Sequence, residues 1–275
     1  MPGTQFFSVL FALVLIPLFI VTGLPEASAQ VNVETMRGEA PTEGWGGTFA
    51  TSLELSRGNQ DLLDVGGTLH VGYQLLYEQD GEEKRRVRRH TFLTTRYRLA
   101  RQSEETFLHE GFAHLRWTEM WMPRLGGESF LQYQYNEAAR LNARALAGGG
   151  MRAILVSTGP FDLVAGLGAM VEYERIRVAP GAGDEPETLG VRSTNYVSAV
   201  VTLLDGSVRF INTAYVQPLV TNPADLRLLN ELQAQLAVTE RIAVGLSLRL
   251  FYDSRPPTEV EPYDLTLRNS IQVRF

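Results

Sequence analysis

The end of the chain, from Tyr263 to Phe275, alternates between apolar and polar side chains almost without a break. Only Asn269 interrupts the apolar parity, and the opposite parity, from Asp264 to Arg274, is wholly polar. Because successive side chains of a strand point to opposite faces, this segment predicts a strand with one apolar and one polar face. Such a strand suits a sheet edge in a soluble protein, or a membrane barrel with lipid on one side and a polar lumen on the other.

The two ends of the chain agree on a compartment. A terminal Phe275 after such alternation is the form of the C-terminal signal of bacterial outer-membrane barrels, which the barrel-assembly machinery recognises. At the other end, Phe6 to Val21 is a nearly unbroken apolar run, followed by the small residues Ala27 to Ala29 before Gln30. This pattern predicts a cleaved signal peptide, because the run is short for a membrane-spanning helix and ends in a cleavage site.

Composition excludes several kinds of protein. The chain of 275 residues contains no cysteine, which excludes disulfides and metal sites built on thiolates. The net charge of -6 gives no general affinity for nucleic acid. Beyond the first run no apolar stretch reaches the length of a spanning helix, so a membrane form of this chain would have to cross as strands.

The same alternation predicts strand after strand along the rest of the chain, with no convincing helix. Together with the last strand this makes about twelve, an even number, as single-chain bacterial barrels require. The sequence thus predicts an all-β, antiparallel up-and-down transmembrane β-barrel of about 12 strands. The other expected strands are Gly47–Ser56, Leu63–Tyr77, Val87–Leu99, Phe107–Trp117, Phe130–Glu137, Arg144–Val156, Phe161–Glu174, Arg192–Leu203, Val208–Leu219, Leu226–Thr239 and Arg241–Tyr252.

The connections between these strands sort by length. Three connections that follow even-numbered strands are tight, as periplasmic turns are. They are Ser157–Pro160, Leu204–Ser207 and Thr239–Arg241. Ile176–Gly190 and Asp253–Pro262 follow odd-numbered strands and are long, as external loops are. The first external loop, near Gly58, is a short exception.

Aromatic residues fall where the interface girdles of a membrane barrel belong. The alternative is that these aromatics flank turns of a soluble β protein. The candidates are Trp45, Tyr77, Trp117, Trp121 and Phe275 at the periplasmic rim, and Tyr173, Tyr252 and Tyr263 at the outer rim.

Three segments carry a resemblance to a known family. Their sequences are similar to those of the domain of unknown function 481 family. The segments are Tyr252–Pro257 with the strand after it, the opening Val31–Glu34, and Gly46–Gly58. Its members are described as candidate salt-induced outer-membrane proteins. The resemblance implies an outer-membrane β-barrel and brings no catalytic residues to this chain.

The histidines allow a test of enzymatic alternatives. A barrel hydrolase needs a nucleophilic Ser beside a His base, and none of His70, His90, His109 and His114 stands in the His-x-Ser-Asn pattern of barrel phospholipases. His109 and His114 are five residues apart, which places their imidazoles on opposite faces of a strand and argues against a shared metal. The sequence therefore predicts no catalytic residues, no metal and no cofactor.

The polar parity of the predicted strands is rich in charge. These groups could line a narrow passive pore, which the sequence slightly favours, or pair with one another and close the interior. The lumen-facing candidates are Glu54, Asp64, Arg88, Arg96, Arg98, Arg152, Glu172, Arg249, Arg268 and Arg274, with Arg116 and Glu231 on the same parity.

Two charged clusters remain. The basic run Lys84–Arg89 could contact phosphates of the inner leaflet, although a solvated turn is the simpler interpretation. The acidic loop residues could hold divalent cations that bridge lipopolysaccharide, or be merely solvated; these are Asp184, Glu185, Glu187, Glu259, Glu261 and Asp264.

The sequence supports one domain plan: a signal peptide over 1–29, a periplasmic segment over 30–43 and a monomeric barrel over 44–275. The expected location is the cell outer membrane, and the expected partners are outer-membrane lipids, lipopolysaccharide and the barrel-assembly machinery, with no nucleic acid. The expected role is structural, with a pore for ions or small solutes as the open question. A lipid-modifying hydrolase and a soluble periplasmic β protein are the alternatives.

Overall fold

Each of the predicted segments forms a strand. The structure, a computed structural model, describes residues 43–57, 61–77, 86–103, 105–239 and 242–273. The strands run β1 Gly44–Ser56, β2 Leu62–Leu76, β3 Val87–Gln102, β4 Glu105–Met122, β5 Leu125–Asn136, β6 Leu141–Ser157, β7 Phe161–Ile176, β8 Glu187–Leu203, β9 Val208–Leu219, β10 Asn222–Ala237, β11 Ile242–Asp253 and β12 Tyr263–Val273.

The strands form a single antiparallel sheet in chain order. β1 pairs with β2, β2 with β3, and so on to β12, which confirms an all-β, up-and-down architecture of twelve strands. In the described residues β1 and β12 are the two edges of this sheet. Some predicted features lie outside the described residues. They are the signal peptide, the basic residues Lys84 and Arg85, and the terminal residues Arg274 and Phe275.

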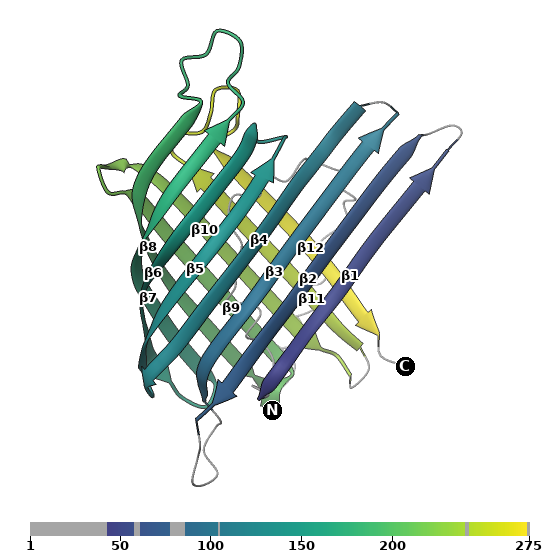
Figure 1. Cartoon of the computed structure of the whole chain (residues 1–275). Coiled ribbons are helices and arrows are strands. Elements are labelled where there is room, and N and C mark those ends of the chain that lie inside the picture. The colour runs from purple at the N-terminus through teal and green to yellow at the C-terminus, as the bar shows by residue number, and fades with distance from the viewer. Residues whose placement is uncertain (1–42, 58–60, 78–85, 104, 240–241, 274–275) are drawn as a thin grey trace, which may run out of the picture.

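The sheet curls strongly, so that β9–β12 form a second wall behind β1–β5 (Figure 1). A contact across the hollow shows which face is concave. β4 and β8 are four strands apart, roughly 19 Å along a flat sheet, yet Nη2 of Arg116 on β4 lies 3.4 Å from the Tyr196 hydroxyl on β8. The face that carries these two side chains must therefore be the inner one.

The two ends of the sheet differ in their connections. The loops 177–186 and 254–262 lie at one end, which we call the loop end, and β1 begins at the other, which we call the N-terminal end (Figure 1). Most N-terminal-end connections are tight, as expected, and Leu204–Gly206 forms a short 3-10 turn there. The predicted rule also has exceptions: the connection 77–86 joins β2 to β3 at this end and is long, while the loop-end connections 103–104, 137–140 and 220–221 are short.

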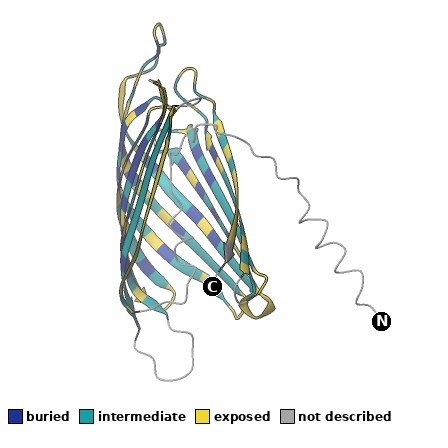
Figure 2. Cartoon of the chain, turned by 90° about the vertical axis from the view of Figure 1, so that its right-hand side faces the viewer, coloured by how far each residue is buried: buried dark blue, intermediate teal, exposed yellow. Residues whose placement is uncertain are grey.

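Burial in this fold is the reverse of that in a soluble protein. Concave-face positions hold buried Arg, Glu, His and Gln side chains, with a small apolar cluster of Tyr196, Tyr215, Leu229 and Phe251 among them. Convex-face positions hold exposed Leu, Val and aromatic residues, and buried and exposed positions alternate along the strands (Figure 2). No helix in the described part of the chain has the length and apolarity to cross a membrane.

Candidate functional site

The densest group of charges lies on the concave face near the loop end. We call it the loop-end network; every strand from β6 to β11 except β9 contributes, because each places a charged residue on its concave parity at a similar height. Its members are Arg144, Glu172, Glu174, Arg192, Asp225, Arg227 and Asp253.

Arg227 of β10 is the centre of this network. Its Nε lies 2.8 Å from Asp253 Oδ2 on the neighbouring strand, and Nη2 lies 3.0 Å from Glu174 Oε2 on β7. Its Nη1 also pairs with Glu172. Arg192 adds a second bridge, with Nε 2.9 Å from Glu172 Oε1 and Nη2 2.8 Å from Asp225 Oδ1. Strands three positions apart are thereby linked through buried charge pairs rather than through the sheet.

The segment Tyr252–Pro257 contributes Asp253 to this network, and its two prolines cover the network at the loop end. Besides binding Arg227, Asp253 accepts the backbone N–H of Arg255 through Oδ1 at 2.9 Å. The Ser254 hydroxyl accepts the Leu226 N–H at 2.7 Å and donates to the Ala224 carbonyl at 3.0 Å. Pro256 and Pro257 line a cavity of about 40 Å³ against Arg144 and Glu174. The sequence pattern of this loop is thus explained by its docking onto β10 and the network.

Three loops are joined above the network. Thr258 donates its N–H and its hydroxyl to Asp184, each at 3.0 Å, and Arg140 pairs with Glu259. Arg177 donates to the Glu137 carbonyl at 3.3 Å. Two of the acidic loop residues considered as cation ligands are therefore engaged by protein groups, and the described residues contain no cluster of three or more His, Asp or Glu side chains arranged for a metal.

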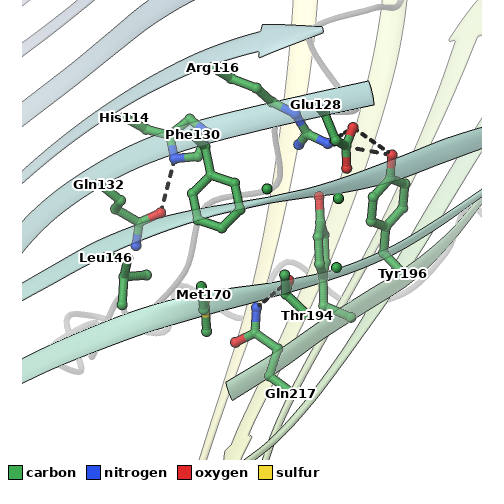
Figure 3. Close-up of a pocket in the computed structure, with 14 residues that line it drawn as sticks. His114, Arg116, Glu128, Phe130, Gln132, Leu146, Met170, Thr194, Tyr196 and Gln217 are labelled. Atoms are coloured by element: carbon green, nitrogen blue, oxygen red, sulfur yellow. Dashed lines mark hydrogen bonds and ion pairs between the residues drawn. The ribbon is translucent and has the colours of Figure 1, made fainter. Parts of the chain in front are cut away.

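A second group of charges crosses the interior farther from the loops. The Tyr196 hydroxyl donates to Glu128 Oε2 at 3.0 Å, and Arg116 Nη2 lies 2.5 Å from the same Glu128 oxygen (Figure 3). The Tyr196 hydroxyl also accepts from Arg152 Nη1 at 2.7 Å. The Tyr196 ring rests on Gly166, where an added Cβ would come within 2.0 Å of it. The absence of a side chain at Gly166 therefore leaves room for the Tyr196 ring, whose hydroxyl reaches these two arginines.

A small cavity of about 30 Å³ adjoins this group (Figure 3). His114, Gln132 and Gln217 are among its polar lining residues. His114 stacks with Phe112 and Phe130, and its Nδ1 bonds to Gln132 Oε1 at 3.0 Å, while its Nε2 has no hydrogen-bond partner among the described residues. A cavity of this size holds one or two water molecules, which is far less than a continuous channel needs.

The structure places the predicted lumen residues in three different settings. Arg152 and Glu172 are buried in the groups described above, while Asp64 pairs with Arg98 at 3.2 Å and Glu231 with Arg249 at 3.2 Å. Arg96 is half-buried on the same concave face, and Glu54 and Arg268 occupy concave-face positions of the exposed edge strands. Arg88 stands at a bulge where β2 meets β3, is exposed at the N-terminal end, and lies 3.7 Å from Glu119.

The predicted girdle residues lie on the convex face or at its ends. Trp45, Trp117 and Trp121 are exposed toward the N-terminal end, and Tyr252 pairs in register with exposed Tyr263 near the loop end. Tyr173 is half-buried on the convex face of β7. Tyr77 donates its hydroxyl to the Met120 carbonyl at 2.6 Å, and burial raises the pKa of that hydroxyl above its ordinary value.

Sequence reasoning missed several members of the site. Parity alone does not show which charges meet, so it does not distinguish these residues from others on the polar faces of their strands. They are Arg144, Arg192, Arg227, Asp253, Glu128 and Tyr196. Tyr97, Tyr133 and Tyr135 add convex-face aromatics near the loop end that the girdle prediction lacked.

Comparison with known proteins supports the relationship that the sequence suggested. No curated protein matches the chain. The family described as "Protein of unknown function, DUF481" matches residues 52–275, which includes every strand after the first and the Tyr252–Pro257 loop. The match covers most of the chain, so the protein belongs to the DUF481 family.

Proposed function

We propose that this protein is a closed β-barrel of the bacterial outer membrane, exported through a cleaved signal peptide, with a structural role in the envelope and no covalent catalysis. The observation that carries the proposal is the reversed burial of the sheet. Arg, Glu and His side chains are buried on the concave face, whereas Leu167 is 69% exposed and Leu131 is 56% exposed at the middle of their strands.

Reversed burial has a direct thermodynamic meaning. Exposed apolar surface costs about 25 cal/mol per Å² in water, and soluble monomers rarely expose more than a few hundred Å² of it in one patch. A lipid surround removes this cost and leaves the polar groups facing one another inside. Family membership and the even number of strands are consistent with this environment.

The convex face contains a few polar side chains that need an account in lipid. Asn212 and Asn230 lie on it at the β9–β10 pair and exchange side-chain amide bonds of 3.2 and 3.3 Å. Asn195 donates to Ser193 at 2.8 Å. Because these amides have protein partners, their transfer to lipid costs less than that of free polar groups.

Closure of the barrel requires β1 and β12 to pair. Backbone groups along a free edge have no water to bond inside a membrane, so lipid strongly favours joining the two edges. Arg268 of β12 lines the same hollow, of about 290 Å³, as Ala50 and Ser52 of β1, so the two edges already face a common space. We infer that they join in the bilayer.

Inside the barrel, the charge pairs favour a closed interior over the narrow passive pore that the sequence left open. The loop-end network and the group around Tyr196 connect opposite walls between β4 and β11. The cavities beside these two groups have volumes of only about 30 and 40 Å³. The hollow of about 290 Å³ beside β1–β3 and β12 is the remaining space, and we expect the joining of β1 to β12 to close it to ions.

Planar-bilayer recording tests this proposal. Refolded protein that migrates differently on a gel before and after heating is expected to insert and to show no sustained single-channel steps. Opening both interior groups by combining Arg116→Gln, Arg192→Gln and Arg227→Gln should produce steps, while Arg101→Gln, an exposed arginine of β3, should not. Steady steps from the unmodified, heat-modifiable protein would contradict a closed interior, and failure to insert would contradict the membrane assignment.

A further inference from the structure

The convex face carries a groove that the barrel itself does not explain. It has a volume of about 470 Å³ and runs across β3–β7. Small residues Ala113, Ala145 and Ala147 lie along it, and Leu131, Tyr133 and Tyr173 stand beside them. Sites of about 300–1,000 Å³ commonly hold small molecules. Apart from the hydroxyls of its two tyrosines, the convex-face lining of this groove is apolar, which suits a hydrocarbon chain.

A polar cluster lies on the same face toward the loop end. The His109 ring packs edge-on against Tyr97 and Tyr135, with centroids 6.0 and 5.0 Å away. Its Nδ1 lies 2.8 Å from Glu137 Oε1, and its Nε2 lies 3.3 Å from the Tyr135 hydroxyl. His109 is thus held by groups from two neighbouring segments, on the side of the sheet opposite to His114.

The groove and the cluster are neighbours along β4. Only Gly111 separates His109 from Ala113 on the convex face, and Gly111 pairs with Tyr97 on one side and Tyr135 on the other. The Tyr135 ring covers this glycine, since an added Cβ would stand 2.3 Å from it. The groove therefore ends at Ala113, next to the tyrosine ring that separates it from the imidazole of His109 and the carboxylate of Glu137.

A positive charge completes the head of this site. The Arg177 side chain is anchored by its 3.3 Å bond to the Glu137 carbonyl, beside the carboxylate that holds His109, and the residue is exposed. An exposed guanidinium suits a phosphate group. Tyrosine rings with one polar end are the side chains typical of membrane interfaces.

We propose that this groove and cluster bind one molecule of the phosphorylated acyl glycolipid of the outer leaflet, lipid A. An acyl chain occupies the groove, and a sugar phosphate pairs with Arg177 at the loop end. The inference rests on the proposed function, because the loop end must face outward for this lipid to reach the site. Long loops mark the external end of such barrels, which favours lipid A over an inner-leaflet phospholipid.

Native mass spectrometry of the refolded protein in detergent tests the site. Lipid A, dephosphorylated lipid A and phosphatidylethanolamine are added in turn, and the bound fraction is measured. The unmodified protein is expected to retain one lipid A with at least tenfold preference over phosphatidylethanolamine. Ala145→Trp, which fills the groove, should weaken lipid A binding tenfold or more, whereas Ala199→Trp on the convex face of β8 should leave it unchanged.

A second variant examines the head of the site without altering the sheet. Arg177→Gln should weaken binding of lipid A several-fold and leave binding of its dephosphorylated form unchanged. Equal retention of lipid A and phosphatidylethanolamine, or retention of lipid A by Ala145→Trp, overturns the site. Heat-modifiable, inserted protein that binds no lipid A overturns the site alone, whereas protein that does not insert overturns the proposed function as well.

Discussion

Replacing Arg227 by Met is expected to lower the free energy of unfolding by about 3–5 kcal/mol, the usual cost of removing one partner from a buried ion pair. Arg227 is buried and binds Glu172, Glu174 and Asp253. The two glutamates would still pair with Arg144. Asp253 would lose Arg227, its one ion-pair partner among the described residues. Urea unfolding of the refolded protein in lipid vesicles, followed by Trp fluorescence, measures the change.

Two further variants show whether that loss comes from the network. Arg101→Met, at an exposed arginine, should change stability by less than about 1 kcal/mol. Asp253→Asn combined with Arg227→Met should cost less than the sum of the two single changes, because the second replacement removes the charge that the first leaves unpaired. A loss below about 1 kcal/mol for Arg227→Met would mean that water solvates these groups and that the interior is open.

Leu167→Arg is expected to destabilise the protein by about 2–4 kcal/mol in a bilayer, the cost of Arg at the midplane of a membrane barrel. Leu167 lies at the middle of β7 on the convex face and is 69% exposed. In a soluble protein the same replacement at so exposed a position would change stability by less than about 0.5 kcal/mol. The measurement is again urea unfolding in vesicles.

Leu204→Arg is the matched control for this prediction. Leu204 is also highly exposed, at 72%, but it lies in the turn between β8 and β9 at the N-terminal end. Water surrounds such a turn in either environment, so the control should be nearly neutral. A large loss in both variants, or in neither, would contradict a lipid band across the middle of the convex face.

The faces of the strands could be predicted from the sequence because they depend on parity alone. The alternation of Leu93 and Tyr97 with Arg96 and Arg98, for example, needs only the geometry of one strand. The strand ends were less exact: β8 begins at Glu187, and the expected strand began at Arg192. The early residues of β8 alternate weakly, and their pairing with β7 extends the strand.

The partners of the charged residues could not be predicted in the same way. Arg227 reaches Glu174 because the sheet curls and because the registers of the intervening strands bring both to one height. Neither curvature nor relative height is visible in the alternation of one strand. The His109 cluster could not be predicted for a related reason, since its partner Glu137 stands at the end of the next strand, 28 residues along the chain.

The central claim, that lipid covers the convex face and not the concave one, is tested most directly by fluorescence quenching at two adjacent residues. The chain has no cysteine, so Leu131→Cys and Gln132→Cys each carry one bimane label on opposite faces of β5. In vesicles of brominated lipid, the label at 131 should be strongly quenched and the label at 132 should not. Equal quenching at the two positions, or quenching of 131 only by iodide in the water, would contradict the account.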